Sequence, residues 1–231
     1  MESDSILDSQ AIYWDRAYQM TRRPYWPDET LERWLHTLKE PKGYALDLGC
    51  GSGRNLVALA HAGFVPCGID GSKTAIAAAK RRLEEYLLAH GTEKELPIGW
   101  GELVVGGFSS LPWPDGYFRV AVEVNVLEHL SLGDRLAAVK EMARVLAPGG
   151  DAFFRMFANP SWGLPAADEA HSVYRNDGTR LHWFLIPEAL GMLLGAGFLV
   201  RSAELEMKSL MGMGPQSWHW VVWAMKAGVD E

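Results

Sequence analysis

A run of glycines between residues 49 and 53 is the feature of this chain with the clearest chemical meaning. Gly49, Gly51 and Gly53 follow the apolar stretch 45–48 and precede a segment with helical periodicity. Glycines at such a turn let the backbone bend tightly and let a ligand lie directly against it, because no Cβ intervenes. The pattern predicts a ligand-binding turn between a strand and a helix.

Two carboxylates accompany this turn. Asp47 lies just before it, and Asp70 ends the next apolar stretch, 21 positions after Gly49. A carboxylate about 20 residues beyond such a turn is placed to reach ribose hydroxyls. A nicotinamide dinucleotide site would require a third glycine one position later, where the chain has Arg54, and Asp47 favours a ligand with a cationic amino group over one with two phosphates. An oxidoreductase is therefore the weaker alternative.

The elements that position these residues follow from the hydrophobic pattern. From residue 44 onward, short apolar runs alternate with helical periodicity, which is typical of βαβ units and a parallel sheet. A further helix is expected near 187–194. The expected strands are 45–48, 65–69, 103–105, 118–126, 152–156, 198–205 and 218–224. The sequence predicts an α/β fold: a Rossmann-like, doubly wound, mostly parallel seven-stranded sheet with helices on both faces.

Two regions fall outside this alternation. Residues 1–40 combine aromatic and charged residues and predict two short helices, interpreted as an N-terminal helical lid before a main domain at 41–231. Residues 158–182 are rich in Pro, Gly, Asn and Asp and show no period, so they predict a long irregular connection on the substrate side.

Composition excludes several classes of protein. The formal net charge of −7 disfavours a protein that binds nucleic acid by neutralising phosphates. Two cysteines are too few for a disulfide framework, and neither a signal peptide nor an apolar run long enough to span a bilayer is evident. We expect a cytoplasmic protein without a membrane or nucleic-acid partner; the oligomeric state stays open.

Four stretches in order carry a family resemblance: the glycine turn, residues 106–118, residues 126–130 and residues 144–150. Residues 44–157 resemble the class I S-adenosylmethionine-dependent methyltransferases. By this resemblance S-adenosyl-L-methionine is the cofactor, the three glycines line its methionine part, and Asp70 binds its ribose hydroxyls. The same resemblance implies further cofactor contacts at Asp47, Gly107, Phe108 and Asn125.

The chain departs from the family pattern at two positions. The family usually has Asp where Gly107 stands, accepting a hydrogen bond from the adenine amino group, and Asp where Arg119 stands. Losing one hydrogen bond weakens a cofactor about tenfold at most, so a site with several other contacts survives. The departures nevertheless favour one alternative, a catalytically inactive protein that binds the cofactor and regulates or partners another.

The reaction implied is methyl transfer to a small-molecule acceptor that the sequence does not identify. His129 follows the fourth strand at the carboxyl edge of the sheet, where ligands of such folds bind, and it is the candidate base; the alternative is a structural role in the loop. Tyr18, His171 and His182 are the candidate substrate contacts, weighed against solvated or packing roles. The histidines and acids show no metal-ligand spacing, so no metal is expected.

Overall fold

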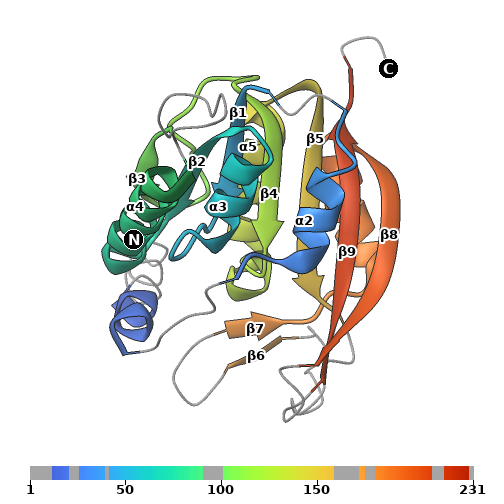
Figure 1. The fold of residues 1–231 in the computed structure, drawn as a ribbon. Helices are drawn as coiled ribbons and strands as arrows, with labels where there is room; N and C mark the ends of the chain where they lie inside the picture. The colour runs from blue at the N-terminus through green and yellow to red at the C-terminus, as the bar shows by residue number, and fades with distance from the viewer. Residues whose placement is uncertain are drawn as a thin grey trace.

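One seven-stranded sheet forms the centre of the molecule, with strand order β3-β2-β1-β4-β5-β9-β8 (Figure 1). The computed structural model describes residues 12–20, 26–39, 42–90, 101–158, 172–174, 180–209 and 216–228. The strands of the sheet are β1 (Tyr44–Leu48), β2 (Val65–Asp70), β3 (Leu103–Val105), β4 (Phe118–Val124), β5 (Leu146–Phe157), β8 (Phe198–Ser209) and β9 (Gln216–Lys226).

Parallel pairing joins β3, β2, β1, β4 and β5, whereas β9 runs antiparallel to both β5 and β8. Because parallel strands share their polarity, the segments that follow β1, β2 and β4 all emerge at one edge of the sheet. This topology confirms the predicted fold class and brings the glycine turn, Asp70 and Asn125 to that common carboxyl edge.

Helices cover both faces of the sheet. They are α2 (Glu29–Leu35), α3 (Arg54–His61), α4 (Lys73–His90), α5 (Leu132–Val145) and α6 (Ile186–Gly195), and residues 12–20 are also helical. Alternate residues of the strands separate two cores: Ala45 and Val120 pack with α2 and α3, whereas Leu46 and Ala121 pack with α5 and α6. Burial on both sides explains why these strands are almost continuously apolar.

Some boundaries differ from the sequence prediction. The fourth strand ends at Val124 instead of residue 126, because Asn125 has a φ of 61° and residues Leu127–His129 form the 3₁₀ helix η1. A φ in the left-handed region cannot continue an extended strand.

The connection at 158–182 contains regular structure that the sequence analysis did not expect. Within it, β6 (Ser172–Tyr174) and β7 (Arg180–His182) pair antiparallel. This pair lies below the carboxyl edge of the main sheet in Figure 1. Three-residue strands are too short to produce a readable period, so composition alone suggested an irregular loop.

Among the described residues, no helix combines the length and apolar character needed to cross a membrane.

Candidate functional site

The turn between β1 and α3 has a backbone that favours glycine at three places. Gly49, Gly51 and Gly53 have φ values of 68°, 53° and 81°, all in the left-handed region. The amides of Gly49 and Cys50 both donate to the carbonyl of Ile69, at 2.8 and 3.1 Å, which ties the turn to the end of β2. Residues with a Cβ rarely adopt this backbone conformation. The spacing of the three glycines is therefore a consequence of the shape of the turn.

Close packing provides a second reason for these glycines. A Cβ at Gly49 would collide with Val126, and one at Gly53 would lie 2.9 Å from the Cα of Ala79 in α4. At Gly51 the obstacle would be the hydroxyl of Tyr18, which belongs to the N-terminal helical residues 12–20. Two of the glycines therefore permit protein packing, and Gly51 brings the turn against the N-terminal helix.

Asp70 is hydrogen-bonded directly to this turn. Its Oδ2 accepts from the amide of Gly51 at 2.9 Å, and its Oδ1 accepts from the amide of Ser72 at 2.9 Å. Burial raises the pKa of the Asp70 carboxyl, which is 8% exposed, while the two amides oppose that shift. Each carboxylate oxygen can accept more than one hydrogen bond, so Asp70 keeps capacity for further donors.

Asp47 is buried beneath the same turn. Its Oδ2 has no hydrogen-bond partner within the described part of the chain, and the residue is 1% exposed. Burial raises the pKa of its carboxyl to about 8; Arg54 lowers that pKa, and Asp70 adds to the rise. A cation placed nearby would favour the ionised form, so the environment of Asp47 is suited to a positively charged ligand group.

Two further buried carboxyl groups lie at the carboxyl end of β4 and in η1, Glu123 and Glu128, and the sequence analysis did not select either of them. Glu123 accepts at Oε1 from the amides of Val126 and Leu127, and Glu128 accepts at Oε1 from Asn125 Nδ2 at 2.8 Å. Both residues are 0% exposed, and the Oε2 of each has no hydrogen-bond partner among the described residues. The sequence signal that could have identified Glu123 is that this acid lies between apolar residues of β4, after Val122 and before Val124.

The electrostatics of this pair differ from those of surface acids. Burial raises the pKa of Glu123 well above its ordinary value, and the neighbouring Glu128 adds to that effect. Burial also raises the pKa of Glu128 to about 7, although Asn125, Arg135 and Arg155 act in the opposite direction. A carboxyl that titrates near neutral pH at the end of a strand is suited to proton transfer.

His129 lies on η1, directly after Glu128. Its ring is half-buried and packs edge-on against the indole of Trp14, with 4.9 Å between ring centroids. Arg135 holds this helix from the α5 side, since its Nε donates to the carbonyl of Leu127 and its Nη2 to that of Leu130. The position at the carboxyl edge agrees with the sequence prediction, and the contact with Trp14 ties His129 to the N-terminal helix.

The helical residues 12–20 contact three parts of this edge. Tyr18 lies over Gly51, Trp14 packs on His129, and Asp15 accepts from Ser72 Oγ at 2.9 Å and from the amide of Thr74 at 2.8 Å. The amide of Thr74 lies in the first turn of α4. This helix therefore spans from the glycine turn to η1.

Of the other predicted substrate contacts, His182 is placed by β7 in a buried network. It is 4% exposed, and its Nε2 lies 2.8 Å from Glu188 Oε1, which also pairs with Arg135 at 3.3 Å. Because Arg135 also holds η1, His182 is linked to the turn that carries Glu128 and His129. His171 lies outside the described residues.

The segment after β3 contains the two residues predicted to face the adenine. Phe108 is partly buried and packs against the larger hydrophobic core, while a Cβ at Gly107 would meet nothing within 4 Å. The carbonyl of Asp70 accepts from the amide of Gly106 at 3.0 Å, so this segment adjoins the end of β2. Gly107 therefore has open space where the first side-chain atom of the family's aspartate would begin.

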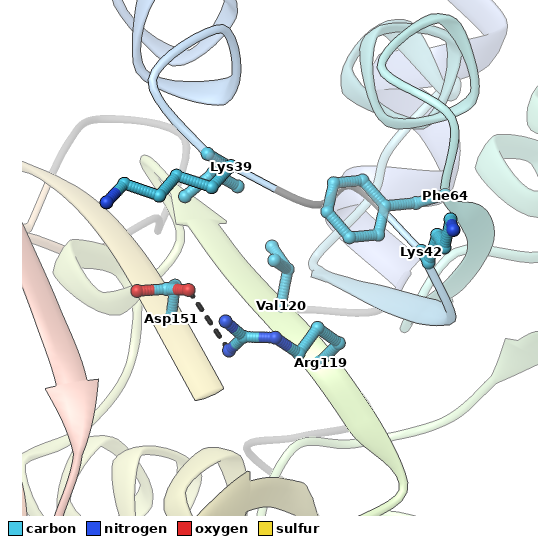
Figure 2. A pocket seen from close by; sticks show the side chains of 7 residues that line it. Lys39, Lys42, Phe64, Arg119, Val120 and Asp151 are labelled. Carbon is cyan, nitrogen blue, oxygen red and sulfur yellow. Dashed lines mark ion pairs between the residues drawn. The ribbon is translucent and has the colours of Figure 1, made fainter. Parts of the chain in front are cut away.

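Arg119, the second departure from the family pattern, lies elsewhere. It stands at the start of β4, where its Nη1 pairs with Asp151 Oδ2 at 3.1 Å in a cavity at the amino edge of the sheet (Figure 2). The candidate site follows the opposite ends of the same strands. Arg119 is therefore separated from the predicted cofactor contacts by the length of β4.

The described residues contain no group of three or more His, Cys, Asp or Glu side chains arranged to hold a metal ion.

Comparison with known proteins defines the class to which this fold and site belong. Residues 46–154 match the model of a family described as "Methyltransferase domain". Residues 46–154 therefore have the sequence of a methyltransferase domain, in agreement with the resemblance.

Individual relatives differ in what they are named for. The chain is 34% identical over 130 residues to a demethylmenaquinone methyltransferase of Bacillus licheniformis, covering 54% of this chain and 48% of that protein. It is 28% identical over 158 residues to a probable tRNA methyltransferase 9B of Homo sapiens, covering 66% of this chain and 30% of that protein. The chain thus matches half the length of these curated relatives or less.

Among solved structures, a Burkholderia thailandensis 1,6-didemethyltoxoflavin-N1-methyltransferase with bound 1,6-didemethyltoxoflavin and S-adenosylhomocysteine superposes with a TM-score of 0.70. The sequences are 16% identical, and the alignment covers 98% of this chain and 89% of that one. At this identity the similarity supports the fold.

Proposed function

We propose that this protein transfers a methyl group from S-adenosyl-L-methionine to a small-molecule acceptor at the carboxyl edge of its sheet. The observation that carries the proposal is that two buried carboxyl groups lie directly against the glycine turn. Asp70 accepts a hydrogen bond from Gly51, and Asp47 lies just before the turn with an Oδ2 that has no partner among the described residues. Few ligands other than a nucleoside with a cationic tail need both features in one place.

The residues present fit this cofactor. Asp70 would accept from the ribose hydroxyls, Asp47 would stabilise the positive charge of the methionine part, and the backbone at Gly49, Gly51 and Gly53 would lie against it. Gly107, Phe108 and Asn125 would complete the contacts, with the adenine beside Phe108. When bound, the cofactor supplies a methyl group already activated on a sulfonium sulfur, so the protein's own residues must position the acceptor, exclude water and accept a proton.

We assign the exclusion of water to the N-terminal helical lid, residues 1–40, over the main domain at 41–231. The contacts of Trp14, Asp15 and Tyr18 with η1, α4 and the glycine turn support this role. The β6–β7 pair, within the insertion at 158–182, would close the substrate side through the link from His182 to Arg135. Enclosing the site would remove water from the reacting groups, which favours methyl transfer to the acceptor.

Two residues are candidates for the general base that takes the proton from the methyl acceptor. His129 has the expected position, but its ring packs on Trp14. Glu128 is buried, carries an unpaired Oε2 and has a pKa of about 7. In the transfer, the acceptor's lone pair would form the new bond to the methyl carbon, the sulfur would keep the electrons of the broken bond, and the acceptor's proton would pass to Glu128. Glu128 is the stronger candidate because its acidity is tuned to neutral pH.

A small acceptor is favoured over nucleic acid by the net charge of −7. Relatives named for demethylmenaquinone and for 1,6-didemethyltoxoflavin methylation support the same choice, while the relative named for tRNA supports the other. One observation also favours a second function, a cofactor-binding protein without activity: Gly107 offers no side chain to the adenine amino group.

Calorimetry with S-adenosylmethionine, followed by a product assay over thiols, phenols, amines and carboxylic acids, separates these possibilities. Saturable binding with methylation of at least one acceptor would support the proposal. Binding without turnover on any acceptor would favour the inactive protein, and absence of binding would contradict the cofactor assignment.

A further inference from the structure

A cavity of about 460 Å³ lies at the edge of the sheet opposite the glycine turn (Figure 2). Lys42, Phe64 and Arg119 lie within two residues of the starts of β1, β2 and β4, so the cavity opens at the amino ends of these strands. Sites that enclose small molecules in proteins usually have volumes of about 300 to 1,000 Å³. The cavity is therefore large enough for an organic ligand, and it is separate from the proposed cofactor site.

Its charged groups are predominantly basic. Among the described residues that line the cavity, Lys39, Lys42 and Arg119 stand against one acid, Asp151, an excess of two positive charges in a chain whose net charge is −7. Lys39 and Lys42 project from opposite sides in Figure 2, with the ion pair of Arg119 and Asp151 between them. Local charge opposite in sign to that of the whole chain attracts anions to this place.

Arg119 is held in position without being buried. Its Nη1 donates to the carbonyl of Gly149 at 2.7 Å and pairs with Asp151 at 3.1 Å, while 46% of its side chain is exposed. A guanidinium fixed by one carbonyl and one carboxylate keeps other N–H groups available for a ligand. The ordering cost of binding at Arg119 is consequently reduced.

The remaining lining is apolar. Phe64 and Val120 line the cavity but are themselves only 1% and 0% exposed, so Leu38, which is partly buried, is the apolar residue that presents surface to it. A phosphate group alone would leave this surface in contact with water. An organic body attached to the phosphate would cover it and gain hydrophobic stabilisation.

We infer that this cavity binds a small organic phosphate, with the dianionic phosphate among Lys39, Lys42 and Arg119 and the organic body against Leu38. An excess of two positive charges matches a dianion, and lysine ammonium groups bind phosphate as point charges. A small ligand fits better than a polyanion, because the acidic charge of the chain repels long phosphate backbones. This inference does not depend on the methyl-transfer activity.

Phenyl phosphate is the probe for this site, and isothermal titration calorimetry in a low-salt buffer without phosphate is the measurement. The parent protein should bind it saturably, and inorganic phosphate should bind about fivefold or more weakly because it lacks the ring. The double variant Lys39→Gln/Lys42→Gln should weaken phenyl phosphate about tenfold or more. The control Lys80→Gln/Lys140→Gln removes two exposed lysines of α4 and α5 and should change the affinity by less than about twofold.

Circular dichroism of each variant verifies the fold. Binding that is lost in Lys39→Gln/Lys42→Gln and retained in both the lysine control and Asp70→Ala would support the site at the amino edge. Absence of saturable binding to the parent would overturn the inference. Equal weakening in the two double variants would also overturn it, since it would show a general response to net charge, and loss in Asp70→Ala would place the ligand at the glycine turn.

Discussion

The two edges of the sheet place ionisable groups in opposite environments. At the carboxyl edge, Asp47, Glu123 and Glu128 are almost inaccessible to solvent. At the amino edge, Lys39, Lys42 and the half-exposed Arg119 surround an open cavity. The same strands, β1 and β4, begin at one edge and end at the other. The comparison shows that proximity in sequence, such as that between Arg119 and Glu123, says little about shared function in a parallel sheet.

The largest difference is expected between two arginine–aspartate pairs. Arg155 and Asp28 are 1% and 2% exposed at their side chains, and Nη1 of Arg155 also pairs with Glu206. Arg155→Gln should lower the free energy of unfolding by about 3 to 5 kcal/mol, because it leaves buried carboxylates uncompensated. Urea denaturation measures the change. A decrease in the free energy of unfolding below about 1 kcal/mol would show that solvent reaches this pair. Its environment would then not differ from that of the exposed pair of Arg119 and Asp151.

Cofactor binding should depend strongly on Asp70. Asp70→Ala removes a charged acceptor and leaves the amides of Gly51 and Ser72 without it, so the affinity for S-adenosylmethionine should fall by about 1.5 to 3 kcal/mol. Calorimetry measures the loss, and Glu84→Ala, an exposed acid on α4, is the control. Unchanged affinity in Asp70→Ala would show that the carboxyl edge does not hold the ribose.

Glu128 should make stability depend on pH. Because its pKa is raised from 4.5 to about 7, the folded chain holds this proton over that interval and the unfolded chain releases it. The free energy of unfolding should therefore fall as the pH rises from about 4.5 to about 7. Glu128→Gln cannot ionise, so relative to the parent it should gain about 1 to 3 kcal/mol between pH 4.5 and pH 8.

Urea denaturation at several pH values measures this gain. Glu84→Gln is the matched control at an exposed position and should follow the parent at every pH. Part of the rise in the pKa of Glu123 comes from Glu128, so the difference between the parent and Glu128→Gln reports this coupled pair of carboxyl groups. Identical pH profiles of parent and Glu128→Gln would contradict the buried titration.

A smaller gain is expected at Gly107, where the chain lacks the family's aspartate. Because an added Cβ there would meet nothing within 4 Å, Gly107→Asp should restore an acceptor for the adenine amino group and tighten S-adenosylmethionine by up to about tenfold. Gly107→Ala is the control without an acceptor, and calorimetry compares the two. Equal affinity for both variants would show that the adenine lies elsewhere.

The smallest effect is expected at Arg119. The side chains of Arg119 and Asp151 are 46% and 28% exposed, so Arg119→Gln should change the free energy of unfolding by about 1 kcal/mol or less. It should leave the affinity for S-adenosylmethionine within about twofold, because the substitution lies at the amino edge. A larger loss of cofactor affinity would show that the two edges are coupled through β4.

The sequence predicted the order of elements because each strand is an apolar run and each helix has a readable stripe, and burial on both faces requires that pattern. It located Asp70 and the glycine turn because local backbone geometry demands those residue types. Glu128 was beyond such reasoning, since its pKa depends on Arg135 and Arg155, which arrive from α5 and β5. His182 was placed in a loop for the same reason: Glu188, which binds it, becomes its neighbour only when α6 packs.

Asp15 has a consequence for turnover. Its carboxylate caps the start of α4, and the Thr74 amide and Ser72 hydroxyl hold its pKa below its ordinary value. Whenever residues 12–20 move aside to admit or release a ligand, α4 loses the acceptor for that first-turn amide. In the proposed lid, opening would break both hydrogen bonds of Asp15, so this carboxylate would stabilise the closed arrangement.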